Sequence, residues 1–300
     1  MGDPKLHHYV PQFYLRRFCD ASGRLWAWER DGDRMFVTTP GSVAAENAFY
    51  YLDAVAELGH DPLTMEKQFA DLEGQVACIT SQWLDWIRVA KPGDPIPIPE
   101  PNRDLVALFL SLQFLRTADA RDILARLASA STEGSLGKAE QRSLHIEALW
   151  DDELVSGFTS RIRSAEWIFA RNMTEVPFVT SDNPVAFRSA DNSMWVKVGV
   201  LGPGTYAVYP LAPDVVMYCH PREGPWSKVA AFSGVSPVSL TADMVDSENM
   251  GQVFMAYRLV MSPTNDFAAA REFARTIGTD TYAEQWRNRN PPKPGSAADD

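Results

Sequence analysis

Two adjacent histidines near the start of the chain are candidates for acid–base chemistry. His7 and His8 stand shortly before Pro11, a residue that the first turn of a helix tolerates. At least one imidazole could face a cleft there and exchange a proton near neutral pH. In the alternative interpretation, one histidine hydrogen-bonds to the start of the helix and the other is solvated. Gln12 and Arg16 follow on the same segment and are candidate substrate-binding residues.

A pair of glutamates forms the second candidate group. Glu66 and Glu73 are seven residues apart, so both project from one face of a predicted helix. Carboxylates in that arrangement can hold a divalent cation or act as acid and base. They can equally be ordinary surface charges. Glu73 is the stronger candidate because it lies between Leu72 and Val76 of the apolar stripe.

The segment TSDNPV at residues 180–185 places Asp182 and Asn183 at the end of a predicted buried strand. A carboxylate there could be aimed rigidly at a metal ion or a water molecule, with Asn183 contacting the substrate. The same residue types also make tight turns by bonding to nearby backbone amides. The substitution Asp182→Ala distinguishes the catalytic role from the structural one. Loss of a catalytic carboxylate should abolish activity and leave the fold largely intact, whereas loss of a turn residue should lower stability.

Gln113 and Arg116 share a face, three residues apart, within an otherwise apolar helical segment. An arginine in that setting could clamp a phosphate or carboxylate of a substrate through two hydrogen bonds. Alternatively, it could pair with Asp119 or with a carboxylate in the core. Both interpretations stay open.

A bound divalent metal ion is expected to have oxygen ligands with at most one or two histidines. The chain has 3 cysteines, at positions without CxxC or Cys/His spacing, which argues against a disulfide framework and a cysteine zinc site. Glu73 and Asp182 are therefore the candidate ligands, and Mg²⁺ or Mn²⁺ is the first expectation. HExxH, P-loop, GxSxG and GxGxxG motifs are lacking.

Composition limits the partners. The formal net charge of −11 opposes non-specific attraction to nucleic acid or anionic membranes, so a nucleic-acid partner would need a local basic patch. The N-terminal residues lack the apolar run of a signal peptide, and no later segment approaches the ~20 apolar residues of a membrane span. We expect a cytoplasmic protein without a membrane partner.

Hydrophobic periodicity predicts a helix-rich first half. A short helix should cover residues 11–19, and a β-hairpin should follow with Asp31 and Gly32 at its turn. A proline-rich extended connector is expected at 91–102. The remaining helical patterns cover residues 61–90, 103–130 and 138–163.

The pattern changes near Trp167 to short apolar runs separated by turn residues, which predicts one antiparallel sheet. Helical patterns return at 243–260 and 267–276. The fold class is therefore α+β, a helical layer on one mostly antiparallel sheet with an N-terminal β-hairpin. We predict a single domain over residues 1–287, helix-rich at 1–165, sheet-rich at 166–262 and helical again at 243–287, followed by a disordered tail at 288–300.

Two segments, HHYVPQFYLRRF at residues 7–18 and VPFVTSDNPV at 176–185, resemble a mainly bacterial family known as domain of unknown function 4238. The likeness extends to the acidic residues of the helix after the hairpin, to Gln113 and Arg116, and to a late helix with Asn249 and Gln252. The resemblance implies no particular reaction. It does make the two signature segments candidate sites and adds Asn249 to the candidate substrate contacts.

Two functional hypotheses follow. In the first, the protein is a hydrolase of phosphodiesters or nucleic acid, a nuclease or phosphodiesterase, in which His7 or His8 acts with Glu73 and Asp182 while Arg116 holds the anionic substrate. The N-terminal helix should then dock on the strand that ends at Asp182 and bring one histidine close to it. In the second, the protein is a non-catalytic binding or interaction protein, and the signature segments are structural joints.

Overall fold

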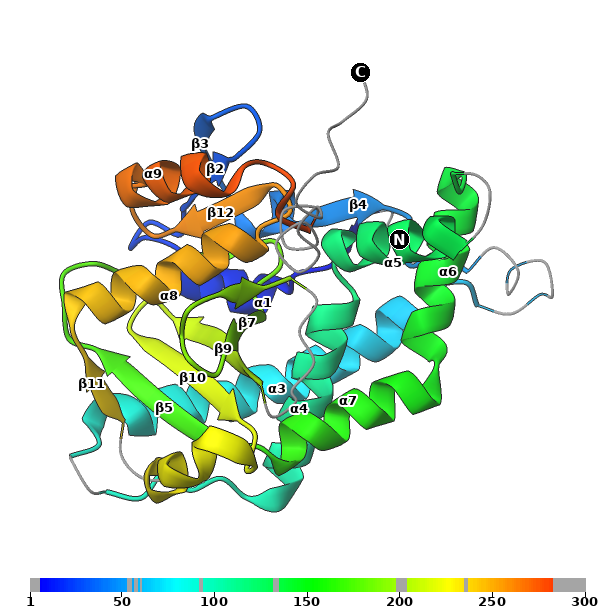
Figure 1. Ribbon diagram of the computed structural model, residues 1–300. Coiled ribbons are helices and arrows are strands. Elements are labelled where there is room, and N and C mark those ends of the chain that lie inside the picture. The colour runs from blue at the N-terminus through cyan, green and yellow to red at the C-terminus, as the bar shows by residue number, and fades with distance from the viewer. Residues whose placement is uncertain are drawn as a thin grey trace, which may run out of the picture.

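The computed structural model describes residues 6–282 except 53–55, 57–58, 60, 92–93, 132–134, 198–203 and 235–236. Helices pack against largely antiparallel strands, which confirms the α+β class (Figure 1). The predicted disordered tail at 288–300 lies outside the described residues.

The N-terminal signature segment forms the predicted short helix, and a strand that its sequence did not predict precedes it. Strand β1 (Leu6–His8) pairs with β4 (Ala45–Asn47), and α1 (Gln12–Leu15) continues into the 3-10 helix η1 (Arg16–Phe18). Tyr14 is buried, and its hydroxyl lies 2.7 Å from Oγ1 of Thr180. The N-terminal helix therefore does pack against the strand that precedes Asp182.

The predicted hairpin is present and belongs to a four-stranded sheet. Strands β2 (Leu25–Glu29) and β3 (Arg34–Thr38) are antiparallel, and the sheet order is β3-β2-β12-β6. Strand β6 (Thr180–Ser181) was expected in the main sheet but pairs here with β12 (Leu259–Ser262). Residues 259–260, expected as helix, are part of that strand because their backbone pairs with β2.

Six strands form the main sheet in the order β11-β5-β10-β9-β7-β8, and all neighbours are antiparallel except β11 and β5. Side chains alternate between its two faces, so each face belongs to a different apolar cluster. The strands are β5 (Glu166–Asn172), β7 (Ala186–Ser189), β8 (Trp195–Val196), β9 (Thr205–Ala212), β10 (Val215–His220) and β11 (Val238–Leu240).

Helices cover both faces of this sheet. The face of the sheet that carries Phe169 packs against the long helix α3 (Thr64–Val89) and against α4 (Glu100–Leu115). Helix α8 (Ala242–Met255) lies across the other face (Figure 1). The rest are α5 (Ala118–Ser131), α6 (Lys138–Trp150), α7 (Asp152–Ser164), α9 (Ala268–Ile277) and the 3-10 helices η2 (Pro40–Ser42) and η3 (Gly224–Phe232).

Capping side chains divide the two helical stretches predicted for the middle of the chain into four helices. Thr117 Oγ1 accepts a hydrogen bond from the Ala120 amide where α5 begins, and Asp151 Oδ1 accepts one from Leu154 where α7 begins. Helix α3 begins at Thr64, not directly after Asp61, and α4 begins at Glu100, inside the predicted connector. Periodicity alone did not locate these boundaries.

Within the described part of the chain, none of the helices has both the length and the apolar composition that a membrane crossing requires.

Candidate active site

A pocket between the N-terminal segment and α3 collects several of the predicted site residues. Its volume is about 310 Å³. Residues spaced about one turn apart on α3 supply one wall, which confirms that Glu66 and Glu73 share a face. The N-terminal segment supplies the other wall. The lining residues are His8, Gln12, Phe13, Arg16, Glu66, Ala70, Glu73, Gly74 and Ala77.

His8 is half-buried at the end of β1. Its Nε2 donates a hydrogen bond to the Gly41 carbonyl at 3.3 Å, and the amide nitrogen of Gln12 lies 3.5 Å from the same ring atom. Burial lowers the pKa of His8, and of the neighbouring charges, Glu73 raises it while Arg116 lowers it. The imidazole is thus neutral at pH 7 and able to accept a proton.

His7 faces the opposite way, as adjacent residues of a strand do. It is buried, its Nδ1 accepts a hydrogen bond from the Tyr50 amide at 3.0 Å, and the two rings stack with centroids 6.0 Å apart. His7 therefore helps to hold the chain around Tyr50, and only His8 lines the pocket.

Behind the pocket, a buried arginine orients Glu73. Arg116 Nη1 donates to Glu73 Oε1 at 2.7 Å, while its Nε and Nη2 both donate to Gln113 Oε1, at 3.2 and 2.8 Å. Gln113 Nε2 in turn donates to the Tyr9 carbonyl at 3.0 Å. All three guanidinium nitrogens are thus engaged. The carboxylate partner of Arg116 is Glu73, which is partly exposed at the pocket, and not Asp119 or a fully buried carboxylate. Gln113 and Arg116 position the Glu73 carboxylate.

Glu66 is the second carboxylate of the pocket, and its surroundings change its pKa. Burial, with a smaller contribution from the charge of Glu73, raises its pKa to about 7. Its Oε2 is buried and accepts no hydrogen bond from the described residues. A carboxyl group that titrates near neutrality can either give or take a proton there. The shared face with Glu73 was the available signal, but tertiary burial produces the pKa shift.

Asp182 is fully buried at the turn after β6, outside this pocket. Its Oδ1 accepts a hydrogen bond from the Tyr257 amide at 2.8 Å, and its Oδ2 accepts from Arg258 and Leu259 at 2.9 and 3.1 Å. Burial nevertheless raises its pKa to about 6. The carboxylate therefore fixes the backbone that connects α8 to β12.

The other two polar candidates from these segments also hold backbone or side chains in place. Asn183 Nδ2 donates to Asp119 Oδ2 at 2.7 Å. Asn249 accepts from the Val179 amide at 2.9 Å and donates to the Pro177 carbonyl at 3.0 Å. Both therefore support the turn rather than line the pocket of His8.

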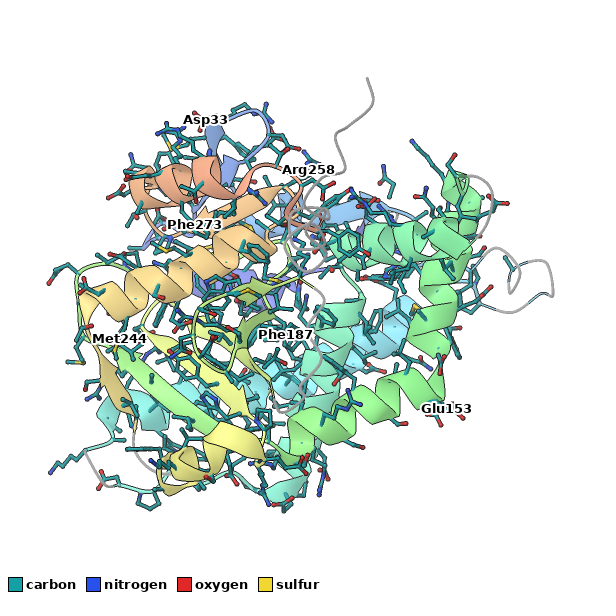
Figure 2. All side chains as sticks on the ribbon, viewed as in Figure 1. Asp33, Glu153, Phe187, Met244, Arg258 and Phe273 are labelled. Carbon is teal, nitrogen blue, oxygen red and sulfur yellow. The ribbon has the colours of Figure 1, made fainter. Side chains whose placement is uncertain are left out.

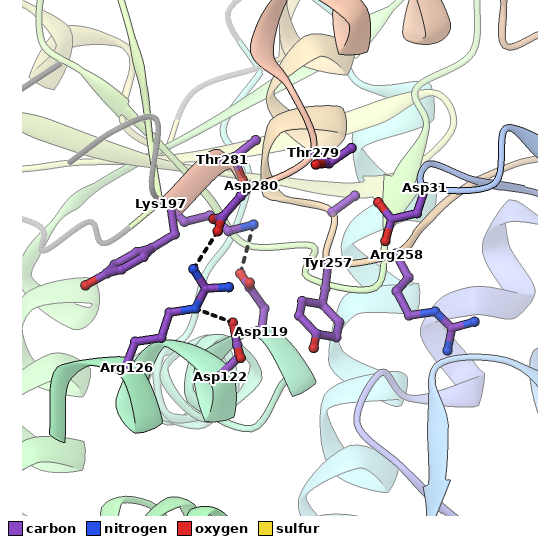
Figure 3. Close-up of a pocket in the computed structure, with 12 residues that line it drawn as sticks. Asp31, Asp119, Asp122, Arg126, Lys197, Tyr257, Arg258, Thr279, Asp280 and Thr281 are labelled. Carbon is purple, nitrogen blue, oxygen red and sulfur yellow. Dashed lines mark hydrogen bonds and ion pairs between the residues drawn. The ribbon is translucent and has the colours of Figure 1, made fainter. Parts of the chain in front are cut away.

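A second pocket, of about 480 Å³, is shown in Figure 3. Its lining includes Tyr257 and Arg258, whose amides bond to Asp182. Its charges are largely matched. Arg126 pairs with Asp122 and Asp280 at 2.8 and 2.6 Å, and the buried Lys197 pairs with Asp119 at 3.0 Å. Because these charged groups already neutralise one another, the His8 pocket is the stronger candidate for proton transfer.

The expected metal ligands do not share a pocket. Glu73 lines the His8 pocket with Glu66, whereas Asp182 is enclosed by backbone amides. Among the residues that the structure describes, no group of three or more His, Cys, Asp or Glu side chains is arranged to hold a metal ion.

The fold and the pocket define an α+β protein in which the N-terminal segment and α3 line a small pocket that contains a histidine and two glutamates. Residues 6–266 match a family described as protein of unknown function (DUF4238), and the chain belongs to that family. No curated protein and no solved structure matches the chain.

Proposed function

We propose that this protein is a hydrolase that cleaves a phosphodiester by general acid–base catalysis in the His8 pocket. The observation that carries the proposal is the meeting of two groups that can exchange protons at pH 7: His8, neutral because burial lowers its pKa, and Glu66, whose pKa is raised to about 7.

His8 would take a proton from the attacking water as its oxygen bonds to phosphorus. Protonated Glu66 would give a proton to the leaving oxygen as the other phosphorus–oxygen bond breaks. Solvent would then return His8 and Glu66 to their starting protonation states.

The remaining charges fit an anionic substrate. Arg16 is exposed at the pocket, and its Nη2 donates to Gln12 Oε1 at 3.1 Å, so a cation stands at the entrance. The charge of Glu73 is matched by Arg116 at 2.7 Å. A protonated Glu66 therefore leaves the pocket without uncompensated negative charge that would repel a phosphodiester.

Two substrates test the assignment of roles. One is a diester with an activated aryl leaving group, which leaves without protonation, and the other is a dinucleotide with an alkoxide leaving group. We expect His8→Ala to slow both reactions by about 100-fold or more, since general acid–base groups contribute about 10²–10⁴ in rate. Glu66→Gln should slow mainly the dinucleotide.

Asp71→Asn is the matched control, because Asp71 is an exposed acid on α3 that does not line the pocket. Reactions with and without added Mg²⁺ or Mn²⁺ test the metal expectation at the same time. Absence of hydrolysis of either substrate under all these conditions would contradict the proposal.

A second candidate function, a non-catalytic binding protein, is favoured by one observation. The side chains of the signature turn are engaged inside the protein, Asp182 by three backbone amides and Asn183 by Asp119. Such contacts are those of a structural joint. If His8→Ala weakens binding of a nucleic acid that the wild-type protein binds without cleaving, this second function holds.

A further inference from the structure

A third pocket, of about 470 Å³, lies on the face of the main sheet that α8 covers, with η3 and β11 at its edge. Volumes of this size are typical of small-molecule sites. It lies on the opposite face of the sheet from α3, so it is separate from the His8 pocket. Its function is therefore independent of the hydrolase proposal.

One wall of this pocket is aromatic. Tyr218 and His220 are two residues apart on β10 and project from the same face, toward Tyr206 on β9. The rings of Tyr206 and His220 stack with centroids 4.4 Å apart and planes 29° apart, and those of Tyr218 and His220 are 5.8 Å and 25° apart. Phe232 and Met244 add apolar surface at the rim, where they are 52% and 50% exposed (Figure 2 labels Met244).

The polar end of the pocket is a buried carboxylate with spare acceptor capacity. Glu248 is 6% exposed, and its Oε1 accepts from Arg188 Nη1 at 3.3 Å. Its Oε2 has no donor in hydrogen-bonding geometry among the described residues. Burial raises the pKa of Glu248 to about 7, although Arg188 and the Tyr218 hydroxyl each lower it. A buried acceptor without a donor is costly, and a ligand that supplies one removes that cost.

Arg188 is already committed to the protein. Its Nη2 donates to the Asn192 carbonyl and to Ser247 Oγ, at 3.0 and 2.9 Å, and its guanidinium stacks on Trp195. It is poorly placed to attract an anionic ligand. Asp243 also lines the pocket and adds negative charge. The site therefore favours a cation that donates hydrogen bonds and carries an apolar ring.

We propose that this pocket binds a small aromatic amine, with its ring against the Tyr206, His220 and Tyr218 wall and its ammonium group donating to Oε2 of Glu248. The aromatic faces would attract both the ring and the positive charge. A neutral aromatic ligand would offset less of the cost of burying Oε2 of Glu248, because it brings no positive charge. An anionic ligand would be repelled by Glu248 and Asp243.

The test uses phenethylamine as probe, with 2-phenylethanol and 3-phenylpropionate as the matched neutral and anionic compounds. Binding is followed by NMR of protein with ¹³C-labelled methionine methyl groups, because Met244 lines the pocket. The Met244 signal is assigned by its absence from the spectrum of Met244→Leu. We expect this signal to shift as phenethylamine is added and to stop shifting when the pocket is saturated. The alcohol and the acid should bind at least tenfold more weakly.

Glu248→Gln should raise the Kd for phenethylamine at least tenfold, while Glu272→Gln, at an exposed acid on α9, should not change it. Val238→Trp adds bulk at the exposed rim of the pocket, on β11, and leaves Glu248 itself unchanged, so it tests the proposal even if Glu248→Gln does not fold. Each of three results would overturn the proposal: an unmoved Met244 signal, equal affinity for the three probes, or wild-type affinity in both variants.

Discussion

The His8 pocket and the turn at Asp182 are built from the two most distinctive segments of the sequence, yet their polar groups are used in opposite ways. At the turn, the Asp182 carboxylate accepts three hydrogen bonds from backbone amides and is closed off from solvent. At the pocket, Glu66 keeps one carboxylate oxygen without a hydrogen bond from the described residues, and the half-buried His8 lines the same pocket.

This difference teaches that a polar signature segment can serve architecture as readily as chemistry. A carboxylate whose lone pairs are occupied by the protein has little left to offer a substrate. A carboxylate with an unoccupied oxygen and a pKa near neutrality is available for proton transfer. Substitutions at Arg116, Asp182, Glu66 and Asn249 test this contrast, from the largest expected effect to the smallest.

Arg116→Leu should lower the free energy of unfolding by about 3–5 kcal/mol, because it leaves Glu73 and Gln113 without their buried donor. Chemical denaturation measures this loss. Arg121→Leu is the control: Arg121 pairs with Glu46 in a more exposed setting and should cost at most about 1 kcal/mol. Similar losses for the two variants would show that the support behind the pocket is dispensable.

Asp182→Ala should lower the free energy of unfolding by about 2–3 kcal/mol, because three backbone amides lose their acceptor while the cost of burying a carboxylate is also removed. Any activity measured per folded molecule should persist. Asp151→Ala, which removes a single capping bond to Leu154, should cost about 1 kcal/mol. A stable Asp182→Ala protein without activity would return Asp182 to the catalytic site.

Glu66→Gln should change how stability depends on pH. Because the folded state raises the pKa of Glu66 to about 7, its protonated form is favoured by folding. That contribution is fully present below the ordinary glutamate pKa and is lost as pH rises through about 7.

Between pH 5 and pH 8, the free energy of unfolding of the wild-type protein should therefore fall by on the order of 1 kcal/mol more than that of Glu66→Gln. Denaturation at the two pH values measures this difference. Asp71→Asn, at an exposed acid on the same helix, should leave the pH dependence as in wild type. In the activity assay, cleavage of the dinucleotide should slow above pH 7 as Glu66 loses its proton. A parallel pH dependence of stability in wild type and Glu66→Gln would show that Glu66 titrates normally.

Asn249→Ala should have the smallest effect, about 1 kcal/mol of stability, through loss of its bonds to Val179 and Pro177. Its activity should equal that of wild type, and Gln75→Ala on the exposed side of α3 should change neither property. A large loss of activity at unchanged melting temperature would instead support the expectation that Asn249 contacts substrate.

Much of the fold followed from local patterns. The hairpin, the long helix α3 and the α+β class were predictable because apolar spacing and turn residues act within a few positions along the chain. The predictions were wrong where distant partners decide the outcome. Strand β6 joins β12, and the end of the predicted late helix becomes β12, because each pairs with backbone remote in sequence.

The sequence by itself determined which residues could do chemistry and that Glu66 and Glu73 share a helix face, since helical periodicity sets that arrangement. Only the tertiary structure decided that His8 and not His7 lines the pocket, and that Asp182 serves backbone amides 75–77 residues away. The physical reason is that burial and hydrogen-bond partners come from other segments. They set both which lone pairs remain available and which pKa values move toward neutrality.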